Sequence, residues 1–177
     1  MKSMQIRKAE KNEFDAVRAF YHSMIDAMAG TPFHPKWQKD IYPSRADLQS
    51  AIDEQSMYIG LLGDSIAAAM VFNHKCGEAY SEAAWPHILT KEEFAVIHML
   101  GVHRAYSGRG YARELVRYAI ALAQAAGMKA VRLDVLKGNV PAERLYESMG
   151  FQYIDTVRLF YEDTGHAEFK LYELELV

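Results

Sequence analysis

The chain has very little cysteine: Cys76 is the single thiol among its 177 residues. One thiol can form no disulfide within the chain and cannot provide a thiolate-rich zinc site. Such cysteine usage is typical of a reducing compartment, so we expect a cytoplasmic protein.

Long apolar runs are also missing. No run approaches the roughly 18 residues of a membrane span, because Asp64 and Ser65 interrupt the most apolar stretch, IGLLGDSIAAAMVF. The first residues, MKSMQIRKAEKNEF, lack the apolar core of a signal peptide. The formal net charge of −3 gives no electrostatic reason to expect nucleic acid or an anionic membrane as a partner. We therefore expect neither of these partners.

What is present is the composition of an ordinary globular protein, with 50% hydrophobic and 24% charged residues. The length suits one domain over residues 1–177. A chain of this size buries roughly 70% of its unfolded surface, so it needs no disulfide or structural metal.

The apolar periodicity predicts a mixed sheet with helices between its strands. The predicted strands are 5–9, a hairpin over 57–74, 94–102, 129–136, 151–161 and 168–176. The predicted helices are 13–29, 44–54, 110–127 and 140–150. The order predicts a right-handed parallel crossover from strand 94–102 to strand 129–136. The last strand alternates imperfectly, which indicates either a bulge or two covered faces.

Two glycines one residue apart stand in VHRAYSGRGYAR, residues 102–113. One interpretation is a dinucleotide fold, in which G-x-G-x-x-G follows a strand and an acid such as Asp134 comes later. Arg113 stands where the third glycine would be, which disfavours this interpretation. Another is a pyrophosphate held by free amides at a helix N-terminus, with Arg104, Arg109 and Arg113 adding positive charge. A third is a turn with no ligand.

A second motif, NVPAERLYESMGF, begins at Asn139. Together the two motifs resemble the GNAT superfamily of acyl-CoA-dependent N-acetyltransferases. In that family an apolar strand precedes [Q/R]-x-x-G-x-[G/A], and a later N-x-x-A-x-x-x-Y helix ends in G-F. Residues 94–151 carry this pattern, with Ser107 as the departure in its first motif position.

The resemblance implies an α/β fold: a twisted mixed sheet of about seven strands with a splayed strand pair and four helices. It also implies acetyl-CoA as cofactor. Main-chain amides from about Gly108 to Ala112 would hold the pyrophosphate, and the end of strand 94–102 would pair with the pantetheine arm. Gly101 is placed for the distortion that the splayed pair requires. The implied cofactor-binding residues are Leu100, Gly101, Val102, Ser107, Gly108, Arg109, Gly110, Tyr111, Ala112, Asn139, Ala142 and Tyr146.

The implied reaction is direct attack by a primary amine on the thioester in a ternary complex. The family position Tyr146 would return a proton to the leaving thiolate. His98 suits the general base because an ordinary histidine pKa is near 6.5. Glu78 and Glu82, acting through water, and Asp134 are alternatives for the base.

The acceptor should lie against two aromatic segments, one between the first two helices and one over 75–93. The candidate residues are His34, Trp37, Tyr42, Tyr80 and Trp85. We expect a small-molecule amine as acceptor and no metal, because the histidines lack ligand spacing. The long terminal strands offer an edge for a homodimer. A non-catalytic module that binds acyl-CoA and regulates a partner is the alternative function.

Overall fold

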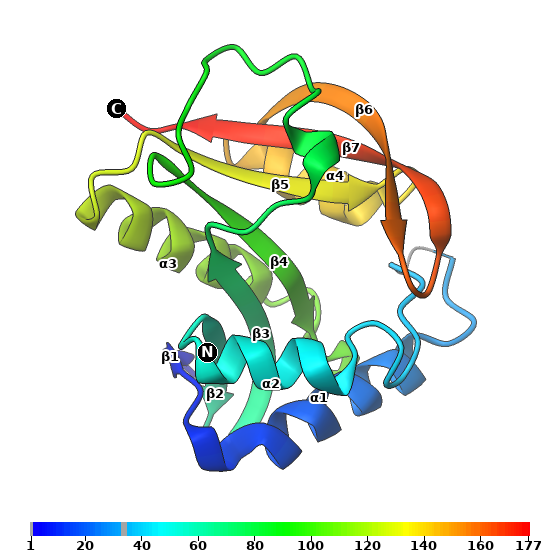
Figure 1. Ribbon diagram of the computed structural model, residues 1–177. Coiled ribbons are helices and arrows are strands. Elements are labelled where there is room, and N and C mark those ends of the chain that lie inside the picture. The colour runs from blue at the N-terminus through cyan, green and yellow to red at the C-terminus, as the bar shows by residue number, and fades with distance from the viewer. Residues whose placement is uncertain (1, 33–34) are drawn as a thin grey trace.

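A single seven-stranded sheet organises the computed structural model, which describes residues 2–32 and 35–177. The spatial strand order is β1-β2-β3-β4-β5-β7-β6 (Figure 1). The strands are β1 (Gln5–Lys8), β2 (Met57–Leu62), β3 (Ser65–Asn73), β4 (Phe94–Val102), β5 (Ala130–Leu136), β6 (Gln152–Tyr161) and β7 (Gly165–Glu175). The helices are α1 (Phe14–Met28), α2 (Arg45–Asp53), α3 (Tyr111–Ala125) and α4 (Val140–Ser148). The predicted α/β fold class is confirmed.

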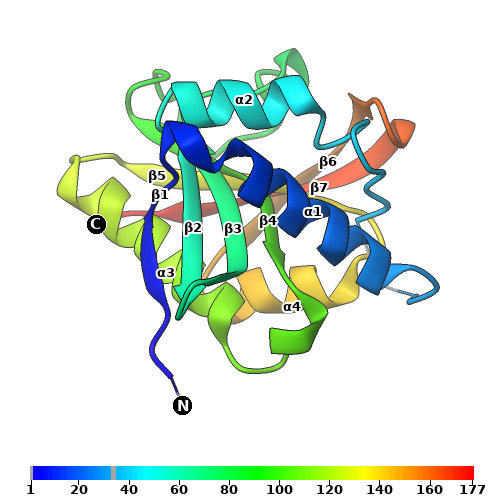
Figure 2. The same cartoon turned by 90° about the horizontal axis from the view of Figure 1, so that it is seen from below.

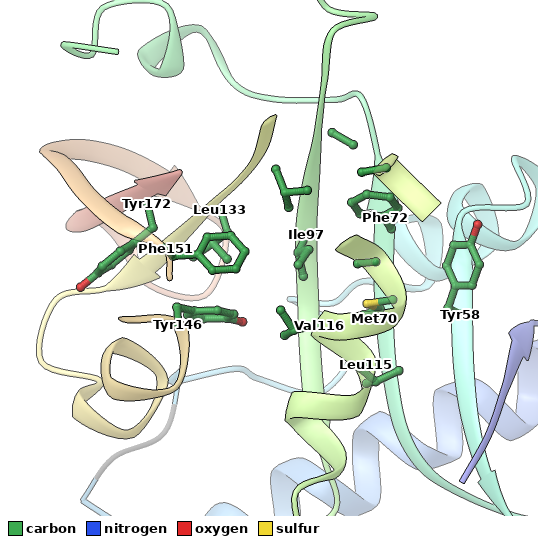
Figure 3. Packing of buried hydrophobic residues seen from close by; sticks show 14 of the residues in the cluster. Tyr58, Met70, Phe72, Ile97, Leu115, Val116, Leu133, Tyr146, Phe151 and Tyr172 are labelled. Carbon is green, nitrogen blue, oxygen red and sulfur yellow. The ribbon is translucent and has the colours of Figure 1, made fainter. Parts of the chain in front are cut away.

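The helices cover both faces of this sheet (Figure 2). On one face, α1 and α2 bury a core with β2 and β3 that includes Val17, Leu48 and Ile59. On the other face, α3 and α4 bury a larger core, in which Leu115 and Tyr146 pack (Figure 3). The segment 75–93 covers β5–β7 through a third core around Tyr80.

Local signals explain how several elements begin. Ser44 and Asp47 cap α2 reciprocally: the Asp47 amide donates to Ser44 Oγ at 3.0 Å, and the Ser44 amide donates to Asp47 Oδ2 at 2.9 Å. Pro141 occupies the first turn of α4, where the missing amide hydrogen costs nothing.

The sheet is parallel at one place only among the described strands, between β4 and β5. Their pairing covers Phe94–Val96 against Ala130–Arg132 and then stops. Beyond these residues the two strands diverge, so the predicted splayed pair is present. The facing edges of β4 and β5 are left without a partner strand in the described chain.

The distortion in β4 lies at Met99, not at Gly101 as predicted. Ala69 pairs with Gly101 and Val71 with His98, so one residue of β3 faces two of β4, and Met99 has a left-handed φ of 53°. The Met99 carbonyl accepts a hydrogen bond from Tyr21 Oη at 2.7 Å, which fixes the bulge from α1. Gly101 is needed for a different reason, because a Cβ there would collide with the Met24 side chain.

The irregular pattern of the last strand arises from two covered faces. Leu171 packs in the core under the 75–93 segment, and Tyr172 packs on the opposite face. The bulge lies on the partner strand β6, where Tyr153 and Asp155 pair with consecutive residues of β7.

Candidate active site

A cavity of about 320 Å³ occupies the gap between the diverging strands. Residues 97–102 of β4 line one side of it, and residues 134–136 of β5 line the other. Asn139, Ala142 and Tyr146 close it from the α4 side, and Trp37 and Tyr42 close it from the segment between α1 and α2. The cavity therefore brings together residues from both predicted motifs and from one predicted acceptor segment.

The glycine loop lies next to this cavity, at the start of α3. Gly108 and Gly110 have φ angles of 74° and 85°, which glycine adopts without strain. An added Cβ would meet nothing within 4 Å at either position, so the space beside the loop is open. Ala112, in the first turn of α3, also lines the cavity. The free amides of that turn, together with the helix dipole, fit a pyrophosphate.

Side chains around the loop mostly face the protein. Ser107 Oγ donates to the Arg104 carbonyl at 2.8 Å, so its side chain closes its own turn. Arg104 reaches the Ala27 carbonyl at 3.3 Å and Arg113 reaches Ser148 Oγ at 2.8 Å. Tyr111 is buried beneath the helix, with its hydroxyl directed to the Lys2 carbonyl. Arg109 is exposed, so main-chain amides are the groups best placed to hold an anion here.

Tyr146 approaches the cavity from the α3 and α4 face of the sheet. It is 7% exposed, packs edge-on against Phe151, and directs its hydroxyl toward β4 (Figure 3). Burial, helped by the charge of Asp134, raises the pKa of this phenol above its ordinary value, so it stays protonated at neutral pH.

His98 and Asp134 lie on the opposite face of the sheet. His98 pairs in register with Val71, a core residue on the α1 side. Asp134 lies two residues after Arg132 on β5, so the two side chains share a face of the sheet. The partner of Arg132 on β4 is Val96, which lies in the core under the 75–93 segment. A proton donor and two groups able to accept protons therefore reach one cavity from opposite faces.

The environment of His98 keeps it neutral. Burial lowers the pKa of this histidine, although the Asp134 charge and the Lys75 carbonyl act in the other direction. Its Nε2 lies 3.0 Å from Asn73 Oδ1, which also accepts from the Lys75 amide, so this contact favours the neutral tautomer with the hydrogen on Nε2 and the lone pair on Nδ1.

Asp134 lies beside two aromatic hydroxyls and accepts a hydrogen bond from one of them. Tyr161 Oη donates to Asp134 Oδ2 at 2.6 Å. Burial raises the pKa of the carboxyl, while this hydrogen bond and His98 lower it in part. The Tyr80 hydroxyl also lowers that pKa, but its geometry falls outside that of a hydrogen bond, so the buried hydroxyl has no formal partner.

The remaining predicted acceptor residues and the alternative bases Glu78 and Glu82 lie elsewhere. Tyr80 and Glu78 line a second cavity of about 470 Å³, which His98 and Tyr161 separate from the first. Trp85 stacks on the Arg132 guanidinium, with Arg132 Cζ 3.9 Å from the centroid of the Trp85 ring. Glu82 is exposed. His34 lies outside the described residues.

Four residues of the β6–β7 hairpin also line the cavity and are not among the predicted site residues: Tyr161, Asp163, Thr164 and Phe169. The sequence pattern places them only in strands and a turn. No local signal marks them, because the hairpin reaches the cavity through its curvature.

The described residues contain neither a cluster of metal ligands nor a membrane-spanning helix. No group of three or more His, Cys, Asp or Glu side chains there could hold a metal ion. None of the helices found there combines the length and the apolarity needed to cross a bilayer.

Comparison with known proteins identifies the family. Residues 19–151 match the model of the acetyltransferase (GNAT) family. The chain belongs to this family. GNAT proteins use acetyl-CoA, and the open glycine loop beside the strand gap fits that cofactor.

One curated relative is the ribosomal protein bS18-alanine N-acetyltransferase of Haemophilus ducreyi. It is 31% identical over 93 residues, which are 52% of this chain and 64% of that protein. This chain aligns with less than two thirds of the length of this relative and of two other similar curated proteins.

Solved GNAT structures share the fold. An acetyltransferase of Streptococcus agalactiae superposes with a TM-score of 0.79 at 23% identity, covering 99% of this chain and 97% of that one. The Salmonella typhimurium protein yncA, solved with its cofactor acetyl-CoA, gives a TM-score of 0.70 at 16% identity, covering 99% and 95%.

Proposed function

We propose that the protein transfers the acetyl group of acetyl-CoA to a small primary amine by direct attack in a ternary complex. The observation that carries this proposal is the cavity between β4 and β5, because it opens next to the glycine loop and contains groups able to accept and to donate protons. When bound, acetyl-CoA supplies an acetyl group activated as a thioester.

The chain would hold this cofactor mainly through its backbone. Amides from Gly108 to Ala112 would bind the pyrophosphate at the start of α3. The unpaired edge of β4 at Leu100–Val102 would bind the pantetheine arm as a strand partner would, with Asn139 and Ala142 beside it. This edge also offers an amide to the thioester oxygen, where negative charge develops during attack.

The amine must lose a proton before it can attack, because an ordinary alkylamine has a pKa of about 10.4. The Asp134 carboxyl attracts the ammonium into the cavity. Neutral His98, with its lone pair on Nδ1, would then accept the proton. We assign His98 as the general base and Asp134 as a binding and positioning residue.

On the opposite face, Tyr146 would serve as the general acid. Its raised pKa keeps the hydroxyl protonated until a thiolate forms, and its hydroxyl is directed toward β4. Acid and base thus approach the cavity from opposite faces of the sheet.

A small acceptor is supported by the volume of the cavity, about 320 Å³, and by the aromatic side chains of Trp37, Tyr42 and Tyr161 that line it. The H. ducreyi relative is named for acetylation of a ribosomal protein, so a peptide acceptor is the appropriate comparison in the assay.

The test combines calorimetry of CoA binding with acetyl transfer across a panel of amines, including an alanyl peptide. Tyr146→Phe should lower kcat by about a hundredfold or more while retaining CoA binding. Tyr172→Phe is the matched control, since Tyr172 packs in the same core as Tyr146. Its hydroxyl donates to Glu147 and does not enter the cavity.

Two results would contradict the proposal. A wild-type protein that binds CoA but transfers acetyl to no amine would indicate the regulatory module instead. An unchanged kcat in Tyr146→Phe would remove Tyr146 from the acid role.

A further inference from the structure

Asp163 is a half-buried residue whose carboxylate has no hydrogen-bond partner in the described chain. It lies in the turn between β6 and β7 and lines the main cavity. Both of its carboxylate oxygens are shielded from water and accept no hydrogen bond. The amides of Asp163 and Thr164 approach closely enough to lower the carboxyl pKa in part, but they do not reach hydrogen-bond geometry, and burial raises that pKa overall. An uncompensated charge in such a place is costly unless the carboxyl takes up a proton or a cation pairs with it.

The turn that carries Asp163 is fixed against the segment between α1 and α2. Gln38 Nε2 donates to the Asp163 carbonyl at 3.0 Å. The Tyr42 and Tyr161 rings meet edge-on with centroids 4.8 Å apart. Figures 1 and 2 both place this segment beside the tip of the β6–β7 hairpin. The Asp163 backbone is therefore anchored at the cavity.

The rest of the cavity favours positive charge. Two carboxylates line it, Asp134 and Asp163, and none of its described lining residues is lysine or arginine. Tyr42 lines the same cavity, and the charges of both carboxylates add to the effect of burial in raising the pKa of its phenol. The rings of Trp37, Tyr42 and Tyr161 add faces that attract cations.

We propose that Asp163 binds a second cationic group of the acceptor, so that the acceptor is a small aliphatic diamine or a similar dication. The amine that is acetylated lies at the Asp134 and His98 end, and the other ammonium pairs with Asp163. Acceptors with a carboxylate next to the amine are repelled. This inference rests on the proposed acetyltransferase function and names its substrate class.

Diaminobutane and butylamine test the proposal, because they share a carbon chain and differ by one ammonium. We expect the wild-type kcat/KM for diaminobutane to exceed that for butylamine by about tenfold or more, as a charge-paired hydrogen bond gives. Asp163→Asn should reduce this ratio to about one. Glu162→Gln removes the neighbouring exposed charge and should retain the wild-type ratio.

A binding measurement makes the test independent of turnover. With CoA present, diaminobutane should raise the thermal midpoint of the wild-type protein more than butylamine does, and this difference should vanish in Asp163→Asn. Three results would overturn the inference and leave the acetyltransferase function standing. The wild-type protein could use both amines equally, or its preference for diaminobutane could persist in Asp163→Asn. It could also acetylate an alanyl peptide efficiently, with no effect of Asp163→Asn. Failure to acetylate any amine, despite CoA binding, would overturn the proposed function itself.

Discussion

At the residue scale, burial affects the two groups nearest the attacking amine in the same direction. It lowers the pKa of His98 and raises that of Asp134, so both are pushed toward their neutral forms. Each also stabilises the charged form of the other. A histidine that stays neutral beside an acid is suited to accept a proton and then to hold it as an ion pair.

The pH profile of kcat tests this role. Because only neutral His98 can accept the proton, kcat should fall as the pH drops through the folded-state pKa of His98. Burial lowers that pKa, so the fall should lie below the value of about 6.5 for an ordinary histidine. His98→Gln should abolish this acidic limb and lower kcat by about a hundredfold.

His87→Gln is the matched control, since His87 is exposed and lies at the surface beside Glu175. Its pH profile should match that of the wild type. An acidic limb that survives in His98→Gln would transfer the base role to another group, with Asp134 the first to examine.

At the element scale, the start of α3 depends on backbone conformation more than on side chains. Gly110 is the N-cap of the helix with φ 85°, and the side chains of Ser107, Arg104 and Arg113 bind to the protein itself. This explains why serine is tolerated at the departure from the family motif. The geometry of the amides is what the loop has to preserve.

Gly110→Val should therefore abolish CoA binding in calorimetry. No atom obstructs a Cβ there, so the cost is the left-handed φ alone, about 1–2 kcal/mol, and the fold should survive while the loop amides move. Gly127→Val imposes the same kind of strain, at φ 72°, just beyond the other end of α3. Gly127→Val should lower the free energy of unfolding by a similar amount and leave CoA binding intact. A loss of CoA binding in both variants would mean that binding depends on α3 as a whole and not on the glycine loop.

The same scale shows what the sequence could and could not predict. The capping box at Ser44, the hairpin turn at Gly63 and the two GNAT motifs are local signals, and each was read correctly. The bulge at Met99 was not, because its left-handed φ is held by Tyr21 from a distant helix. Asp163 and Tyr161 reach the cavity only through the curvature of a long hairpin, which no short pattern encodes.

At the scale of the whole molecule, the sheet consists of two parts joined by a short parallel contact. Arg132 is the last β5 residue in that contact, directly where the cavity begins. Its guanidinium lies between the rings of Trp85 and Phe94, and its Nε donates to Glu173 Oε2 at 2.8 Å, with both side chains 4% exposed. Its Nη2 also reaches the His87 carbonyl at 3.3 Å. This cluster joins β4, β5, β7 and the 75–93 segment at the base of the gap.

Glu173→Gln should therefore destabilise the protein strongly. The substitution leaves the Arg132 charge buried without its counterion, which typically costs about 3–5 kcal/mol of the free energy of unfolding. Glu175→Gln is the matched control on the same strand, because Glu175 is exposed and its ion pair with His87 is long, at 3.5 Å, so the loss should be below about 1 kcal/mol. Urea unfolding of both variants measures the difference. Equal losses would mean that the buried pair does not hold the two parts of the sheet together, and that the cores on either side of the gap are sufficient to keep the active-site strands in place.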